Sequence, residues 1–139
     1  MNDLNRFLEA QERKYDIALS EIKSGKKKRH WMWYIFPQII GLGVSVTADY
    51  YAIKNINEAK EYLNHPVLGN RLREISNELL KLAENDANAI FGYPDDLKLK
   101  SSMTLFMQVE KNKDNVFKKV IDKFFNGELD DKTLNILGI

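Results

Sequence analysis

Apolar residues recur every three or four positions along most of the chain, which is the period of an amphipathic helix. The first apolar stripe predicts a helix over residues 4–24. Asp3 is a suitable N-cap for this helix, and Gly25 stands directly after its last turn, where a C-terminal glycine is common. The chain is therefore expected to begin with a long helix that packs one face on the core.

A second apolar stripe predicts a helix over residues 66–85. Pro66 suits its first position, because the missing N–H of proline costs nothing there. Gly69 lies inside this helix and weakens it by about 1 kcal/mol relative to alanine. A glycine at such a position predicts close packing against a neighbouring element.

Two short helices are expected, one over residues 48–53 and one over residues 56–63. Ser45 and Thr47 are candidate caps for the first of them, and Asn55 and Asn57 are candidate caps for the second. The His-Pro dipeptide that follows the second helix breaks the chain.

The C-terminal part carries a wide apolar face over residues 116–125. Asp114 or Asn115 is expected to cap this helix, and Gly127 follows its end. A last short helix is expected to start at Asp130.

Three segments are harder to assign. Residues 31–36 are all apolar or aromatic, so periodicity does not separate a buried helix from a buried strand, and residues 103–109 leave the same two alternatives open. Residues 85–96 are expected to form a turn-rich linker. Since good helices outnumber doubtful strands, we expect an all-α fold, a compact single-domain bundle of about six to eight helices with irregular orthogonal packing over residues 1–139.

Composition narrows the function classes. The chain has no cysteine, which excludes disulfides and a cysteine nucleophile, and its two histidines do not make a zinc-binding pair, so neither a metal nor another cofactor is expected. The net charge of +1 argues against nucleic acid as the main partner. The first residues lack the features of a secretory signal and no apolar run is long enough to span a membrane, so a cytoplasmic protein with no membrane partner is expected. Oligomeric state and the presence of any enzymatic activity stay open.

The segment "KKKRHWMWYIFPQ", residues 26–38, joins four cations to both tryptophans. Cations beside aromatic rings are typical of surfaces that grip a phosphate and stack a ring, since stacking contributes about 1–3 kcal/mol. The alternative is that the cations are solvated and the aromatic run is core. The candidate ligand-binding residues in this segment are His30, Trp31, Trp33 and Gln38.

The segment "YPDDLKLKSS", residues 93–102, is the second candidate. If it is helical, Asp95 or Asp96 is the N-cap and a cation and two hydroxyls fall within one turn, where they suit a phosphate or a carboxylate. The alternative is a capped helix with exposed lysines. The candidates here are Lys98, Ser101 and Ser102 as ligand-binding residues and Asp96 as a general base.

The motifs "HWMWYIFPQ", "YYAI", "HPVLG" and "IFGYPDDLKLKSSMTLF" together resemble the bacterial family known as domain of unknown function 1810, whose members are sometimes mislabelled calpastatin. The resemblance spans nearly the whole chain. It implies a mostly helical single domain with no established activity. The order of segments is also similar to that of helical N-glycosidases that act on ADP-ribose-linked or riboside substrates, although their late Asp-Trp-Gly-type segment has no counterpart here.

Two functional hypotheses follow. In the first, residues 30–38 and 96–102 face one hollow that binds a small anionic or nucleotide-like molecule. Lys98 holds the anion and Trp33 stacks on a ring. An extension of this hypothesis is hydrolysis of an N-glycosidic bond with Asp96 as the general base. In the second, the cationic segment is an interaction surface for an acidic protein or a nucleic acid, without chemistry.

Overall fold

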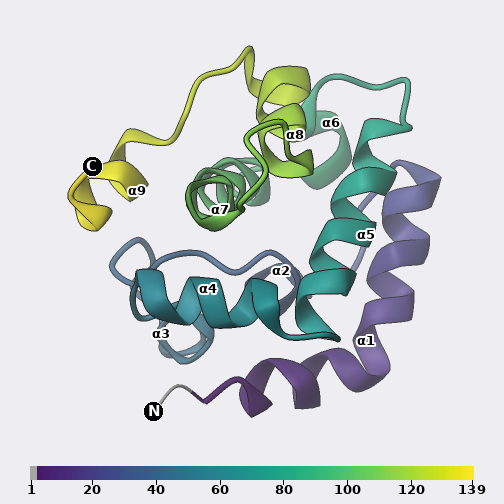
Figure 1. The fold of residues 1–139 in the computed structure, drawn as a ribbon. Coiled ribbons are helices and arrows are strands. Elements are labelled where there is room, and N and C mark those ends of the chain that lie inside the picture. Colours follow the sequence, from purple (N-terminus) through teal and green to yellow (C-terminus); the bar gives the residue numbers. More distant parts are fainter. Residues whose placement is uncertain (1–2) are drawn as a thin grey trace.

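The fold is all-α, as predicted. The computed structural model describes residues 3–139, and in this range it contains nine helices (Figure 1). They are α1 (Asn5–Ser24), α2 (Met32–Ile35), α3 (Val46–Tyr51), α4 (Ile56–Asn64), α5 (Leu68–Leu80), α6 (Ala87–Phe91), α7 (Asp95–Val109), α8 (Val116–Phe125) and α9 (Asp131–Leu137). The expected count of six to eight helices was too low. One reason is α6, a single-turn helix that lies inside the segment predicted to be a linker.

The caps decide where most helices begin. The side chains of Ser45, Asn55, Asn115 and Asp130 accept a hydrogen bond from the first turn of α3, α4, α8 and α9, each as predicted or as one of two predicted candidates. The long first helix closes on Gly25 in the left-handed conformation, with φ of 81°. These short polar residues supply acceptors to backbone N–H groups that lack a partner inside the helix.

Three predicted helix starts were wrong. Asp3 is not at the N-cap position of α1, which is Leu4, although its Oδ1 accepts a hydrogen bond at 3.1 Å from the N–H of Asn5, the first residue of the helix. Helix α5 begins at Leu68 rather than at Pro66, since the Nδ1 atom of His65 accepts hydrogen bonds from the N–H groups of Val67 and Leu68 and holds these residues in a turn.

Helix α7 differs from prediction in the same way. Its N-cap is Pro94, and neither Asp95 nor Asp96 caps the helix, because both lie within its first turn. The Asp95 carboxylate instead pairs with the ammonium groups of Lys27 and Lys98.

Helix α7 is the centre of the molecule. It contacts α4, α6, α8 and α9, and Figure 1 shows it end-on with these helices around it. Residues 101–106 are all buried, so this part of the helix has no exposed polar face. Without such a face the sequence shows no clear apolar stripe, as is usual for helices buried on all sides. Residues 103–109 are therefore helical, which resolves the first open alternative.

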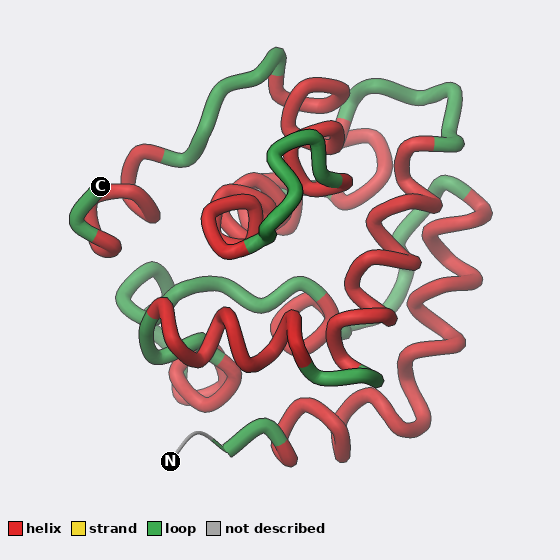
Figure 2. The backbone as a smooth tube through the Cα atoms, viewed as in Figure 1, coloured by secondary structure: helices red, strands yellow, loops and turns green. Residues whose placement is uncertain are grey.

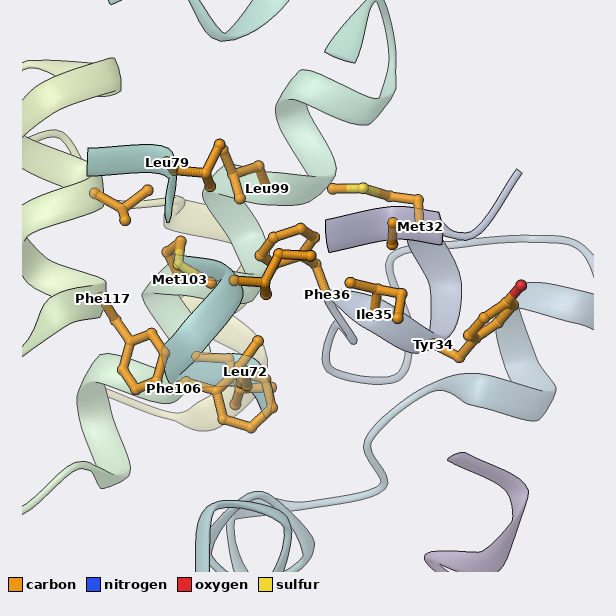
Figure 3. Close-up of a cluster of buried hydrophobic side chains, with 14 of the residues drawn as sticks. Met32, Tyr34, Ile35, Phe36, Leu72, Leu79, Leu99, Met103, Phe106 and Phe117 are labelled. Carbon is orange, nitrogen blue, oxygen red and sulfur yellow. The ribbon is translucent and has the colours of Figure 1, made fainter. Parts of the chain in front are cut away.

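The second open alternative, over residues 31–36, is also decided in favour of a helix. Met32–Ile35 form the single-turn helix α2, whose Met32 and Ile35 side chains lie in the same cluster as Met103 and Phe106 of α7 and Phe117 of α8 (Figure 3). The short helix exists because its side chains complete this core, since a single turn is too short to be stable alone.

Gly69 has the close packing that the sequence predicted. A Cβ atom at this position would lie 2.0 Å from the carbonyl oxygen of Leu63 at the end of α4. Helices α4 and α5 therefore meet at a distance that only glycine allows.

Loops join the outer helices, and two of them matter for the site. Figure 2 shows a loop between α2 and α3 and an extended link between α8 and the peripheral α9. Among residues 3–139, no helix combines the length and the apolar character needed to cross a membrane.

Candidate functional site

A groove of about 660 Å³ lies where three separate segments meet. Its walls are formed by α2 with the loop that follows it, by the first turns of α7, and by the link between α8 and α9. The volume lies within the range of about 300–1,000 Å³ found for small-molecule sites. Four of the predicted residues line it, and they come from two of the three walls: Trp33, Gln38, Lys98 and Ser101.

The first wall presents Trp33 and Gln38. Helix α2 buries its other three side chains, so Trp33 is the half-buried member that faces the groove. Gln38 is held at the backbone, where its carbonyl accepts a hydrogen bond from Ile53 N–H at 2.8 Å in an isolated parallel β-bridge. Its Oε1 atom lies 2.6 Å from the Oγ of Ser101. Within residues 3–139 neither Gln38 Nε2 nor Trp33 Nε1 has a hydrogen-bond partner, so both are donors that a ligand can use.

The loop beyond Gln38 also lines the groove. A Cβ atom at Gly43 would lie 2.5 Å from the Cβ of Ala48, so glycine lets the loop pass close to α3. Val44 is fully exposed at the tip of the loop. Behind this wall is a second hollow of about 10 Å³, which Trp33 and Gln38 also line. Its volume is that of about one water molecule.

The second wall carries two lysines from the start of α7. The Nζ of Lys98 lies 5.1 Å from the centre of the Trp33 ring and 3.4 Å from Oδ1 of Asp95. The Nζ of Lys100 lies 3.1 Å from Oε1 of Glu128, which belongs to the third wall. Both ammonium groups are therefore partly buried cations that already have an electrostatic partner.

The third wall is the segment 128–132, and it carries most of the negative charge. The N–H of Asp130 donates to Thr104 Oγ1 of α7 at 3.0 Å, and the Asp130 carboxylate caps α9. Asp131 and Lys132 are exposed at the groove, and within residues 3–139 neither side chain has a hydrogen-bond or ion-pair partner. In the same range, no three acidic or histidine side chains are grouped as ligands of a metal ion.

Four predicted site residues lie outside the groove lining. His30 is exposed, and Trp31 is 1% exposed in the core, where its Nε1 donates to Glu21. Asp96 accepts hydrogen bonds from Leu97 N–H and from Asn88 Nδ2. Ser102 is fully buried, and its hydroxyl has no hydrogen-bond partner among the described residues.

The cationic segment before α2 is largely used by the fold. The buried carboxylate of Glu21 accepts hydrogen bonds from the N–H groups of Lys28 and Arg29, from Trp31 Nε1 and from the Arg29 guanidinium. Burial by itself raises the pKa of Glu21, but these hydrogen bonds outweigh it and lower the pKa from 4.5 to about 2. Glu21 is therefore ionised at neutral pH and holds the segment in a turn.

Lys27 is also engaged. Its ammonium lies 2.8 Å from Oδ2 of Asp95 and 5.0 Å from the centre of the Trp31 ring, and its side chain is only 7% exposed. Lys26 donates to the carbonyl of Ala89, which leaves Lys28 as the cation of this segment whose side chain has no partner among residues 3–139. Two of the four cations, Lys27 and Arg29, are therefore neutralised by carboxylates, whereas Lys26 and Lys28 are not.

Sequence reasoning missed the third wall. Glu128, Asp131 and Lys132 follow a glycine in a turn, and turn positions favour acidic residues for capping alone. The available signal was three acidic residues within four positions after Gly127, which is more than one cap requires.

Comparison with known proteins supports the fold and gives a family. None of the curated proteins compared with the chain matches it. The crystal structure of the conserved hypothetical protein Rv1873 from Mycobacterium tuberculosis matches with a TM-score of 0.95 at 40% sequence identity, and the match covers 99% of this chain and 97% of that chain. The model of the family described as "Protein of unknown function (DUF1810)" matches residues 1–137. With nearly its whole length matched, the chain belongs to the DUF1810 family.

Proposed function

We propose that the groove binds a small molecule in which an anionic group is attached to a flat ring, as in a nucleotide. The observation that carries this proposal is the convergence of an aromatic side chain, two partly buried lysines and an amide donor on one groove of about 660 Å³. A concave site with a few convergent polar groups is the usual form of a small-molecule site.

Each wall has a separate task in this proposal. Trp33 packs against the ring of the ligand, an interaction that contributes about 1–3 kcal/mol. Gln38 donates from Nε2, and its contact with Ser101 at 2.6 Å fixes the orientation of the amide. The lysines attract the anion, and their charge acts more strongly in a partly buried groove than in water.

Three probes separate these tasks: AMP carries a ring and a phosphate, adenosine only the ring, and ribose 5-phosphate only the phosphate. We expect calorimetry to show the tightest binding for AMP. Lys98→Met is expected to weaken AMP and ribose 5-phosphate by about tenfold and adenosine much less, whereas Trp33→Leu is expected to weaken AMP and adenosine by about tenfold.

The matched control is Lys118→Met, which removes an exposed, ion-paired lysine outside the groove. It is expected to leave all three affinities unchanged. Absence of binding for all probes, or equal losses in the control and in Lys98→Met, contradicts the proposal.

A second candidate function is hydrolysis of an N-glycosidic bond, and the observation that favours it is the Asp131 carboxylate. Such a reaction needs a carboxylate in the site to act as general acid or base. Asp96 lies outside the lining, whereas Asp131 lines the groove without a partner among residues 3–139. The test measures release of adenine from AMP and of nicotinamide from nicotinamide riboside. We expect Asp131→Asn to abolish this release and Asp96→Asn to leave it unchanged. Turnover that Asp131→Asn does not affect contradicts the candidate function.

A further inference from the structure

We infer that the anionic group of the ligand takes the place of the Glu128 carboxylate on Lys100. This inference rests on the proposed function and assigns the anion to a particular cation of the groove. The carboxylate of Glu128 is then an internal competitor, which sets how strongly negative a ligand must be in order to bind.

The first step concerns the contact between the two walls. Lys100 lies on α7 and Glu128 on the link to α9, and their Nζ and Oε1 atoms are 3.1 Å apart. Both residues line the groove. The ion pair therefore joins two of the three walls, and a carboxylate already occupies the position where a ligand anion would meet Lys100.

The second step concerns the unequal burial of the two partners. The side chain of Glu128 is 76% exposed, whereas that of Lys100 is 18% exposed. When the pair separates, Glu128 is readily hydrated, so its release costs little. Lys100 has lost most of its hydration and needs an anionic partner, which a phosphate can supply in place of Glu128. The exchange therefore keeps the buried cation paired.

The third step compares Lys100 with the other lysines of the groove. Lys98 lies over the Trp33 ring and shares Asp95 with Lys27, and the Asp95 side chain is only 19% exposed. Lys98 therefore keeps this partner and attracts the anion from beside Trp33 without exchanging a carboxylate for it. Lys132 is exposed, so water weakens its attraction for an anion. Lys100 is the lysine that combines partial burial with an easily displaced partner.

The fourth step is that the wall does not depend on the Glu128 side chain. The backbone N–H of Glu128 donates to the carbonyl of Phe125 at 2.9 Å, and Asp130 N–H donates to Thr104 Oγ1 at 3.0 Å. The link stays anchored to α7 and α8 by these bonds when the carboxylate turns away from Lys100.

The test is Glu128→Gln, with AMP binding measured by calorimetry at low salt. The amide keeps the shape of the side chain and removes its charge. Exposed ion pairs contribute up to about 1 kcal/mol, so AMP affinity is expected to rise about threefold. The matched control is Asp122→Asn, which makes the same change in net charge at an exposed position outside the groove and is expected to leave the affinity unchanged.

A second pair of variants ties the effect to Lys100. Lys100→Met is expected to weaken AMP binding, and adding Glu128→Gln to it is expected to bring no gain. The inference is overturned if the AMP affinity of Glu128→Gln is unchanged or lowered, or if the gain persists when Lys100→Met is added. In both cases the proposed function still stands as long as the unmodified protein binds AMP. Absence of AMP binding to both the unmodified protein and Glu128→Gln overturns both.

Discussion

Two lysine–tryptophan pairs lie on either side of one carboxylate, and they have opposite surroundings. Lys27 lies 5.0 Å from the Trp31 ring and Lys98 lies 5.1 Å from the Trp33 ring. Asp95 contacts both ammonium groups, at 2.8 Å for Lys27 and 3.4 Å for Lys98. The first pair is closed into the core, whereas the second borders the groove.

The difference shows that residue type does not separate a structural pair from a ligand-binding one. Trp31 is buried and its Nε1 is used by Glu21, while Trp33 is half-buried and its Nε1 has no partner among the described residues. The two pairs differ in whether another group of the protein already accepts the hydrogen bond of the tryptophan Nε1. Binding capacity lies with the pair whose polar atoms are still available.

The largest expected effect comes from changing Glu21, which accepts the hydrogen bond of Trp31 in the buried pair. Glu21→Gln removes the charge that accepts four hydrogen bonds and turns amide hydrogens toward N–H donors. We expect it to lower the free energy of unfolding by about 3 kcal/mol in urea denaturation at neutral pH. The control Glu12→Gln changes an exposed glutamate of the same helix and is expected to cost under about 0.5 kcal/mol. A cost for Glu21→Gln as small as that of the control contradicts the role given to Glu21.

The same substitution has a signature in pH. Folding lowers the pKa of Glu21 from 4.5 to about 2, so its contribution to stability is complete above pH 4.5 and is lost as the pH falls toward 2. The stability difference between the unmodified protein and Glu21→Gln is therefore expected to shrink over this interval in denaturation experiments at stepwise lower pH. A difference that stays constant from pH 6 to pH 2.5 would contradict the lowered pKa.

A smaller effect sharpens the comparison of the two tryptophans. Trp31→Phe leaves a cavity and removes a donor from Glu21, so we expect a loss of about 2 kcal/mol in the free energy of unfolding. Trp33→Phe changes a half-buried ring with no hydrogen bond inside residues 3–139, and its cost is expected to stay below about 0.5 kcal/mol. Thermal denaturation of the two variants measures this, and equal losses would remove the distinction between the pairs.

The smallest effect is expected for the cationic segment. Lys26→Ser and Lys28→Ser together remove two exposed charges that lie outside the groove lining. The affinity for AMP is expected to change less than twofold, because both positions are screened from the groove by solvent. A loss of tenfold or more in calorimetry would favour the interaction surface that the sequence also suggested.

The comparison also shows what sequence alone predicts. The long helix α1, the caps Ser45, Asn55 and Asn115, and the close packing at Gly69 follow from local patterns. Local patterns suffice there because a cap or a helical stripe is determined by residues within one or two turns.

The groove was predicted only in part. Trp33, Gln38, Lys98 and Ser101 were identified from residue type, but the third wall joins them through the contact of Thr104 with Asp130, which is a long-range contact. The different fates of Trp31 and Trp33 also depend on tertiary packing, because residues 31–36 are a run of apolar residues with no period to interpret. Helix α6 likewise depends on packing, since a single turn is too short to be stable alone.

The most direct measurement uses the two tryptophans of the chain as paired reporters. An ¹⁵N–¹H correlation spectrum contains one indole N–H signal from each, and AMP is added stepwise. The proposed groove predicts that the Trp33 signal moves progressively to saturation while the Trp31 signal stays in place. Movement of the Trp31 signal alone, or no movement of either at millimolar AMP, would contradict a nucleotide-like ligand in this groove.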